Sequence, residues 1–157
     1  MTVPLPASSA IPGALTQFMA VAEGALPSGT TVWWGKELGT YSTPLTLQIT
    51  EIVGDQEPAE LGPQFRREEK FSLVCTLSAY QGGPVDQANA ACLTEVMNNF
   101  ALIHSAVANN PTLNQAVRFA QVGNFAINPD TDANGVTAVS LDFQLRCEQR
   151  IRSLDAV

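Results

Sequence analysis

The feature that most constrains the fold of this 157-residue chain is a regular alternation near its C-terminal end. Across residues 139–147 every second position is apolar, and Ser, Asp, Gln and Arg occupy the positions between. A period of two residues places successive side chains on opposite faces of a β-strand. The chain must therefore form a sheet with one apolar face, which requires a covering layer. The apolar positions are Val139, Leu141, Phe143, Leu145 and Cys147.

The covering layer is predicted by two segments with apolar residues at helical spacing. A helix over residues 87–108, with Asp86 as its N-cap, would span roughly 33 Å. A shorter helix of about 12 residues is predicted after the N-cap Ser9, with Pro12 in its first turn and Gly24 near its end. The apolar faces comprise Cys92, Val96, Phe100, Ile103 and Val107 in the long helix and Leu15, Phe18, Met19 and Ala22 in the short one.

Further strands are predicted over residues 30–34, 45–50 and 71–79 and from about residue 117. Turn-rich segments at residues 54–64 and 128–135 are predicted to be loops. The order α-β-β-β-α-β-β indicates a single α+β domain over residues 11–152, with two helices on one face of a mainly antiparallel sheet. Residues 1–10 and 153–157 are expected to be extended tails.

The composition disfavours nucleic-acid binding, and its low share of charge is typical either of a subunit that buries much of its exterior against neighbours or of ordinary variation in composition. Charged residues make up 15% of the chain, against roughly 25% in an average soluble domain. The formal net charge is −7, so tight binding to phosphates is disfavoured, although acidic walls could surround DNA without holding it. We expect neither a secretory leader nor a membrane span, and the three separated cysteines are expected to be reduced.

No pattern in the sequence predicts a catalytic or metal site. His104 is the single histidine and lies within the long predicted helix, without a nucleophile motif elsewhere. Residues 130–135 (DTDANG) resemble the start of a calcium loop, but Leu141 stands where that loop needs glutamate, so a hairpin turn is favoured. The sequence therefore predicts a protein that is not an enzyme and that needs no cofactor.

Three groups of residues are candidates for an assembly interface. One of the adjacent residues Trp33 and Trp34 could be exposed, or both could be buried. A charged run at residues 66–70 leads into the strand at 71–79. The acidic segment at residues 55–60 is opposite in charge to the C-terminal arginines. These opposite charges could join neighbouring subunits head to tail, or they could pair within one chain. The charged candidates are Asp55, Glu57, Glu60, Arg66, Arg67, Glu68, Glu69, Lys70, Arg146, Arg150 and Arg152.

Three segments resemble the tail terminators and related neck proteins of bacteriophages with long, non-contractile tails (siphoviruses), especially those that infect actinobacteria. They are residues 65–72 (FRREEKFS), residues 110–113 (NPTL) followed by residues 117–120 (VRFA), and the final strand ending in residues 150–152 (RIR). The resemblance covers about residues 10–152. Related chains tend to have Trp near Tyr80 and Gly-Gly near Asn114 and Gln115, where this chain departs from the pattern.

The resemblance implies a structural protein of the virion. Such proteins form hexameric rings that cap the tail tube, stop its elongation and offer a docking surface for the head-side neck protein, while DNA passes through the lumen without sequence-specific binding. The expected partners are therefore further copies of the chain, the tube protein and a neck or stopper protein, first in the host cytoplasm and then in the virion. Another neck component, a stopper or head-completion protein, or a tube subunit is the nearest alternative. A soluble binding module or small enzyme is more distant.

Overall fold

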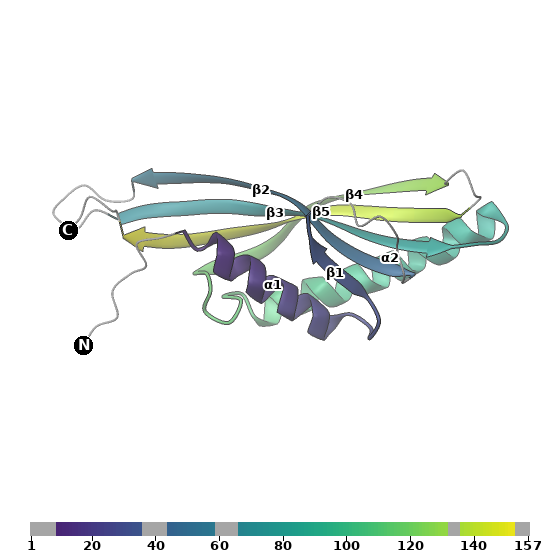
Figure 1. Cartoon of the computed structure of the whole chain (residues 1–157), viewed down its shortest axis with the longest axis horizontal. Coiled ribbons are helices and arrows are strands. Elements are labelled where there is room, and N and C mark those ends of the chain that lie inside the picture. Colours follow the sequence, from purple (N-terminus) through teal and green to yellow (C-terminus); the bar gives the residue numbers. More distant parts are fainter. Residues whose placement is uncertain (1–8, 36–43, 59–65, 132–135, 153–157) are drawn as a thin grey trace.

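A computed structural model of the chain describes residues 9–35, 44–58, 66–131 and 136–152. It contains two helices and one five-stranded sheet, in the order α-β-β-β-α-β-β. Both helices lie on the same side of the sheet (Figure 1). The predicted α+β class and element order are thus confirmed. The elements are α1 (Ile11–Ala25), β1 (Thr31–Trp34), β2 (Leu45–Pro58), β3 (Arg66–Gln81), α2 (Val85–Asn109), β4 (Phe119–Thr131) and β5 (Thr137–Arg152).

The sheet has the strand order β1-β2-β3-β5-β4, so β1 and β4 form its two edges. Neighbouring strands are antiparallel except β1 and β2, which are parallel. The central strands β3 and β5 pair without interruption from Arg66 opposite Arg152 to Gln81 opposite Thr137. The result is a long sheet in which only the N-terminal part of β2, Thr46 to Ile49, is extended sideways by the four residues of β1.

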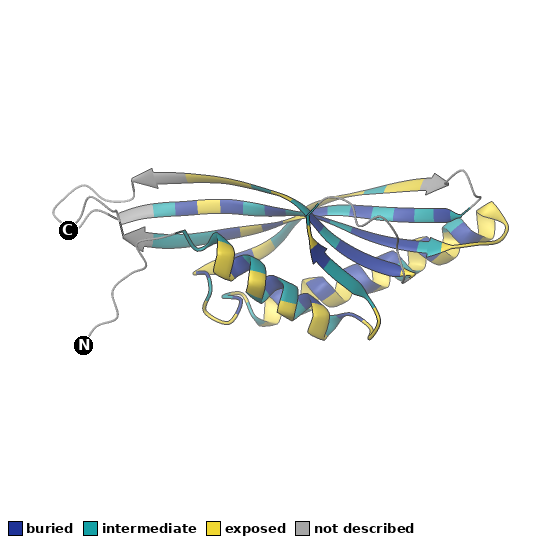
Figure 2. Ribbon diagram, in the orientation of Figure 1, coloured by how far each residue is buried: buried dark blue, intermediate teal, exposed yellow. Residues whose placement is uncertain are grey.

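The core lies between the helices and the sheet, as the alternating pattern predicts. All five apolar positions of β5 are at most 2% exposed, and Figure 2 shows buried positions alternating with more exposed ones along β3 and β5. The five predicted apolar positions of α2 are buried against this face, as are Ala14, Phe18 and Ala22 of α1. Burial of this apolar surface is the main term that stabilises the fold.

Two predicted loops begin as strand. Strand β2 continues to Pro58, and β4 continues to Thr131 through the segment predicted to turn. Gly54 lies opposite Phe71, where a Cβ would lie 3.0 Å from the Cβ of Phe71, so this glycine permits close strand packing and does not end the strand. Pro129 is tolerated because β4 is an edge strand.

The helix starts also differ from the prediction by one or two residues. Ala10 is the N-cap of α1, although the Ser9 hydroxyl still accepts a hydrogen bond from the Ile11 N–H at 3.0 Å. Pro84 is the N-cap of α2, and Asp86 lies inside its first turn. A carboxylate within the first turn still interacts favourably with the positive end of the helix dipole.

A left-handed turn connects α2 to β4. Leu113, Asn114 and Gln115 have φ values of 46°, 56° and 68°, which non-glycine residues seldom adopt. The Asn114 amide holds the turn, because its Nδ2 donates to Gln17 Oε1 at 2.8 Å and its Oδ1 accepts from Asn110 Nδ2 at 2.9 Å. Leu113 is fully buried beneath the turn. Two of these positions are those at which the resembling phage proteins tend to have glycine.

Candidate assembly surfaces

The charged candidate residues gather at one end of the sheet, where β2, β3 and β5 run side by side (Figure 1). Asp55 pairs with Lys70, and Lys70 pairs with Glu148 on the next strand. In the following row of this face, Glu57 pairs with Glu68, and Glu68 with Arg150. Glu60 lies outside the described residues, and only the backbone register is described for Glu57, Arg66, Arg67 and Arg152.

This register places acidic and basic residues next to each other within one chain. The pairs Asp55 with Lys70 and Glu68 with Arg150 are opposite in charge, whereas Glu57 with Glu68 and Arg66 with Arg152 are alike. The head-to-tail arrangement and the pairing within one chain therefore both stay predictions. A shallow groove of about 300 Å³ crosses this face. The exposed Arg146 lines it and also reaches over β4, where a Cβ at Gly123 would lie 3.0 Å from Arg146 Nε. The face carries both signs of charge.

Glu69 differs from the other members of the charged run because it is buried. It is 1% exposed, and its Oε1 accepts a hydrogen bond from the Ala10 N–H at 2.7 Å. This places a carboxylate at the N-cap residue of α1, next to backbone N–H groups that have no partner within the helix. Glu69 thus fixes the start of α1 on the sheet. No local sequence pattern indicates this pairing, because the two residues are 59 positions apart.

The two tryptophans of β1 lie on opposite faces of the sheet. Trp33 pairs with Gln48 and is 9% exposed, whereas Trp34 pairs with Ile49 and is 49% exposed. Ile49 belongs to the core, so Trp34 lies on the helix-facing side at the edge of the sheet. One tryptophan is thus buried and the other is available to a partner.

A single row of side chains connects Trp34 to the opposite edge. In the register of the sheet each residue of this row pairs with the next across all five strands, and the row ends at Phe125 of β4, which is 55% exposed. Phe100 of α2 packs against this end, with ring centroids 5.5 Å from Phe125 and 5.3 Å from Phe143. The apolar core therefore reaches the surface at both edges of the sheet. The row is Trp34, Ile49, Cys75, Phe143 and Phe125.

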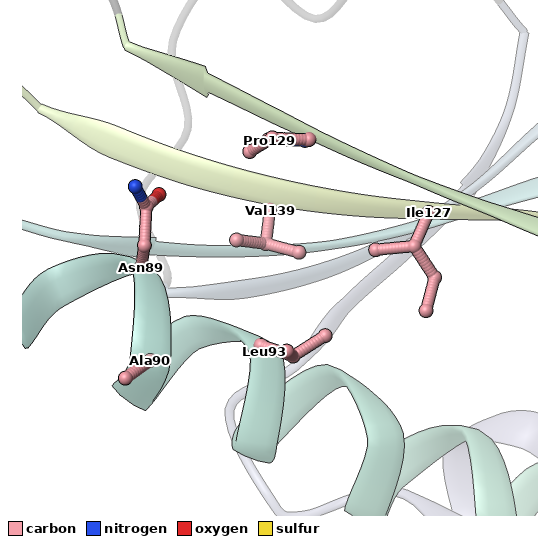
Figure 3. Close-up of a pocket in the computed structure, with 6 residues that line it drawn as sticks. All are labelled: Asn89, Ala90, Leu93, Ile127, Pro129 and Val139. Atoms are coloured by element: carbon pink, nitrogen blue, oxygen red, sulfur yellow. The ribbon is translucent and has the colours of Figure 1, made fainter. Parts of the chain in front are cut away.

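Beside Phe125, a pocket of about 290 Å³ opens between α2, β4 and β5 (Figure 3). Its walls are apolar except for Asn89, whose Oδ1 is buried and has no hydrogen-bond partner among the described residues. Leu93, which is 41% exposed, forms part of the rim. The pocket is lined by Asn89, Ala90, Leu93, Ile127, Pro129 and Val139. Sequence reasoning missed it, although Leu93 and Met97 fall outside the buried series of α2 and could have indicated a second apolar face.

The residues that could carry chemistry lie apart from one another. His104 is exposed on α2 and packs edge-on against Phe100, with ring centroids 6.4 Å apart. Burial raises the pKa of Cys147 to about 12 and also raises the pKa values of Cys75 and Cys92. Across residues 9–35, 44–58, 66–131 and 136–152, no three His, Cys, Asp or Glu side chains are arranged to hold a metal ion. Among the helices described there, none is long and apolar enough to cross a membrane.

Comparisons with known proteins include a weak structural neighbour. No protein-family model matches the chain, and no curated protein matches it. Among solved structures, the chain is similar to one from a structure described as the virion of a native gene transfer agent particle. The identity is 13% and the TM-score 0.31, over 90% of this chain and 99% of the other. A likeness at that TM-score carries no argument about function.

Proposed function

We propose that the chain is a structural protein of a virion, and more specifically a tail terminator. In this role it forms a ring on the last ring of the tail tube, stops the elongation of the tube and presents a surface to the neck of the head. The proposal combines the sequence resemblance at residues 65–72, 110–120 and 139–152 with the surfaces of the fold.

The observation that carries the proposal is the exposure of large apolar side chains at both edges of one sheet. Trp34 at the β1 edge and Phe119 and Phe125 at the β4 edge are each more than 40% exposed. Exposed aromatic groups at an open sheet edge are typical of a surface that another chain covers. Two such surfaces at opposite edges suit a subunit with two neighbours, as in a ring.

The remaining surface suits a passage for DNA better than a grip on it. Helix α2 has 25 residues, and its only charged residues are Asp86 and Glu95. The net charge of −7 disfavours binding to phosphates. The proposed role needs no catalytic group. His104 is exposed beside Phe100, and the other residues that line its groove contain no carboxylate, thiol or hydroxyl group. They are Val107, Ala108, Pro111, Phe119, Ala120, Gln121 and Val122.

The test is an assembly assay with purified tail-tube protein. The full chain, added to polymerising tubes, is expected to shorten them and to appear as one extra ring at a single end in negative-stain images. Native mass spectrometry is expected to give a closed ring near six times 16.7 kDa. Unchanged tube lengths with no bound chain would contradict the terminator role. Long tubes formed by the chain alone would assign it as a tube subunit.

A further inference from the structure

The pocket between α2 and β4 has the size and chemistry of a site for one large side chain. Its volume of about 290 Å³ lies at the lower limit of the roughly 300–1,000 Å³ typical of small-molecule sites. Five of its six lining residues are apolar, and Figure 3 shows Ile127, Pro129 and Val139 facing Leu93 across it. An occupant must therefore be mainly apolar.

The pocket also specifies one polar group on its occupant. Asn89 Oδ1 is buried without a hydrogen-bond donor from the described residues. An unsatisfied buried acceptor is energetically unfavourable, so an occupant that offers one donor to this oxygen when the Asn89 amide turns toward the pocket is favoured over a purely apolar one. A large apolar side chain with a single N–H donor is the indole of tryptophan.

Trp34 is the exposed tryptophan of this chain, and its position suits the pocket of a second copy. It lies at the β1 edge, on the same face of the sheet as the pocket at the β4 edge. Its row across the sheet ends at Phe125, and the next two pairs on the same face of β4 are Ile127 with Leu141 and Pro129 with Val139. Two copies placed edge to edge, with their helices on the same side, therefore bring Trp34 of one copy close to the pocket of the other.

We propose that Trp34 of one copy inserts into the pocket of the next copy and that its indole N–H donates to Asn89 Oδ1. The contact joins opposite edges of two copies, so it is head-to-tail and can repeat around a ring. This inference rests on the proposed function for its biological role, but the contact itself is tested independently of the tail tube.

The first experiment measures the oligomeric state of full-length variants by native mass spectrometry and sedimentation. Trp34→Ala and Leu93→Arg are each expected to weaken the subunit contact by roughly 30-fold or more, because each removes a central apolar anchor. Leu102→Arg is the matched control, since Leu102 lies on the same helix with a similar exposure of 45%, outside the residues that line the pocket. It is expected to leave assembly unchanged.

Mixing the two defective variants tests the direction of the contact. The Trp34→Ala chain retains an intact pocket, and the Leu93→Arg chain retains an intact tryptophan. Each alone is expected to be monomeric, whereas the mixture is expected to form a one-to-one dimer of twice 16.7 kDa. Assembly that is lost in Leu93→Arg but kept in Trp34→Ala would mean that another segment fills the pocket, which overturns the proposal.

A double-mutant cycle tests the hydrogen bond. Trp34→Phe keeps an aromatic ring without the N–H and is expected to weaken the contact roughly tenfold. In an Asn89→Ala background the same change is expected to have almost no further effect. Equal effects in both backgrounds would overturn the hydrogen bond, and a wild-type chain that stays monomeric at its highest attainable concentration would overturn the contact.

The outcomes for the contact and for the proposed function are distinguishable. A ring that caps tubes and survives Trp34→Ala keeps the terminator role and refutes the contact. An oligomer that depends on Trp34 and Asn89 but never binds tubes keeps the contact and refutes the terminator role.

Discussion

Removing the carboxylate of Glu69 should detach the start of α1 from the sheet and destabilise the protein. The residue is 1% exposed, and its Oε1 lies 2.7 Å from the Ala10 nitrogen. A hydrogen bond to a charged group contributes about 1.5–3 kcal/mol. Ala10 is only partly buried, so water can satisfy part of the freed N–H. We therefore expect Glu69→Ala to lower the free energy of unfolding by about 2 kcal/mol, and Tm by about 4–8 °C for a chain of this length.

The amide variant separates the hydrogen bond from the charge. Glu69→Gln retains an acceptor oxygen and loses the interaction of the charge with the helix dipole, so we expect about half of the loss. The assay is urea unfolding followed by far-UV circular dichroism, with the exposed Glu51→Gln as a control that changes stability by less than about 0.5 kcal/mol. A Glu69→Ala variant as stable as wild type would refute the assigned role of this carboxylate.

Three further predictions concern strain, packing and thiol reactivity. Gln115→Gly should stabilise the chain by about 0.5–1 kcal/mol, because φ is positive there. Asn114→Gly should instead destabilise it by about 1 kcal/mol, because the hydrogen bonds of the side-chain amide that hold the turn are lost. Thermal unfolding measures both changes. Gly54→Ala should destabilise the chain by about 1–3 kcal/mol, because the added Cβ overpacks against Phe71. Gly24→Ala should stabilise it by about 0.4–1 kcal/mol, because no atom lies within 4 Å of the added Cβ. Midpoints of urea unfolding that shift equally in the two variants would contradict this difference. At pH 8 the three buried cysteines should react with a thiol reagent only when the chain unfolds, and rapid labelling of the native chain would contradict their burial. The free energy of unfolding should fall as pH rises above the ordinary thiol pKa of 9.0, because the thiol of Cys147 ionises there in the unfolded chain, whereas its pKa in the folded chain is about 12.

The sequence predicts the elements whose side-chain period is clear. It does not predict where a strand ends when pairing with the partner strand determines that end. The alternation in β5 and the helical spacing in α2 predict both elements and their buried faces, because burial of one face is what the period encodes. Gly54 and Pro129 are turn signals in isolation, yet both lie within strands. Pairing with Phe71 and with Val139 supplies the ladder there, and the residue types around Gly54 and Pro129 do not reveal how far that pairing continues.

For the candidate surfaces, too, the sequence indicates the residue types but not how the fold brings them together. The charged residues were identified one by one from their types, but their convergence at one end of the sheet depends on the register between β2, β3 and β5. The exposure of Trp34 was one of two arrangements that the sequence left open. The pocket at Asn89 was not foreseen, because it exists only where α2 crosses β4 and β5.

The strand order also has a consequence for the rate of folding. Strands β2 and β3 form one antiparallel pair from neighbouring segments of the chain, and β4 and β5 form another. The two pairs meet only through β3 and β5, whose opposed residues are separated by between 56 positions at Gln81 and Thr137 and 86 at Arg66 and Arg152. Closing such long loops before any contact is gained is entropically unfavourable. We therefore expect the pairing of β3 with β5 to form late, so that the row from Trp34 to Phe125, and with it both edges that we propose to bind neighbouring subunits, becomes complete only when folding is nearly finished.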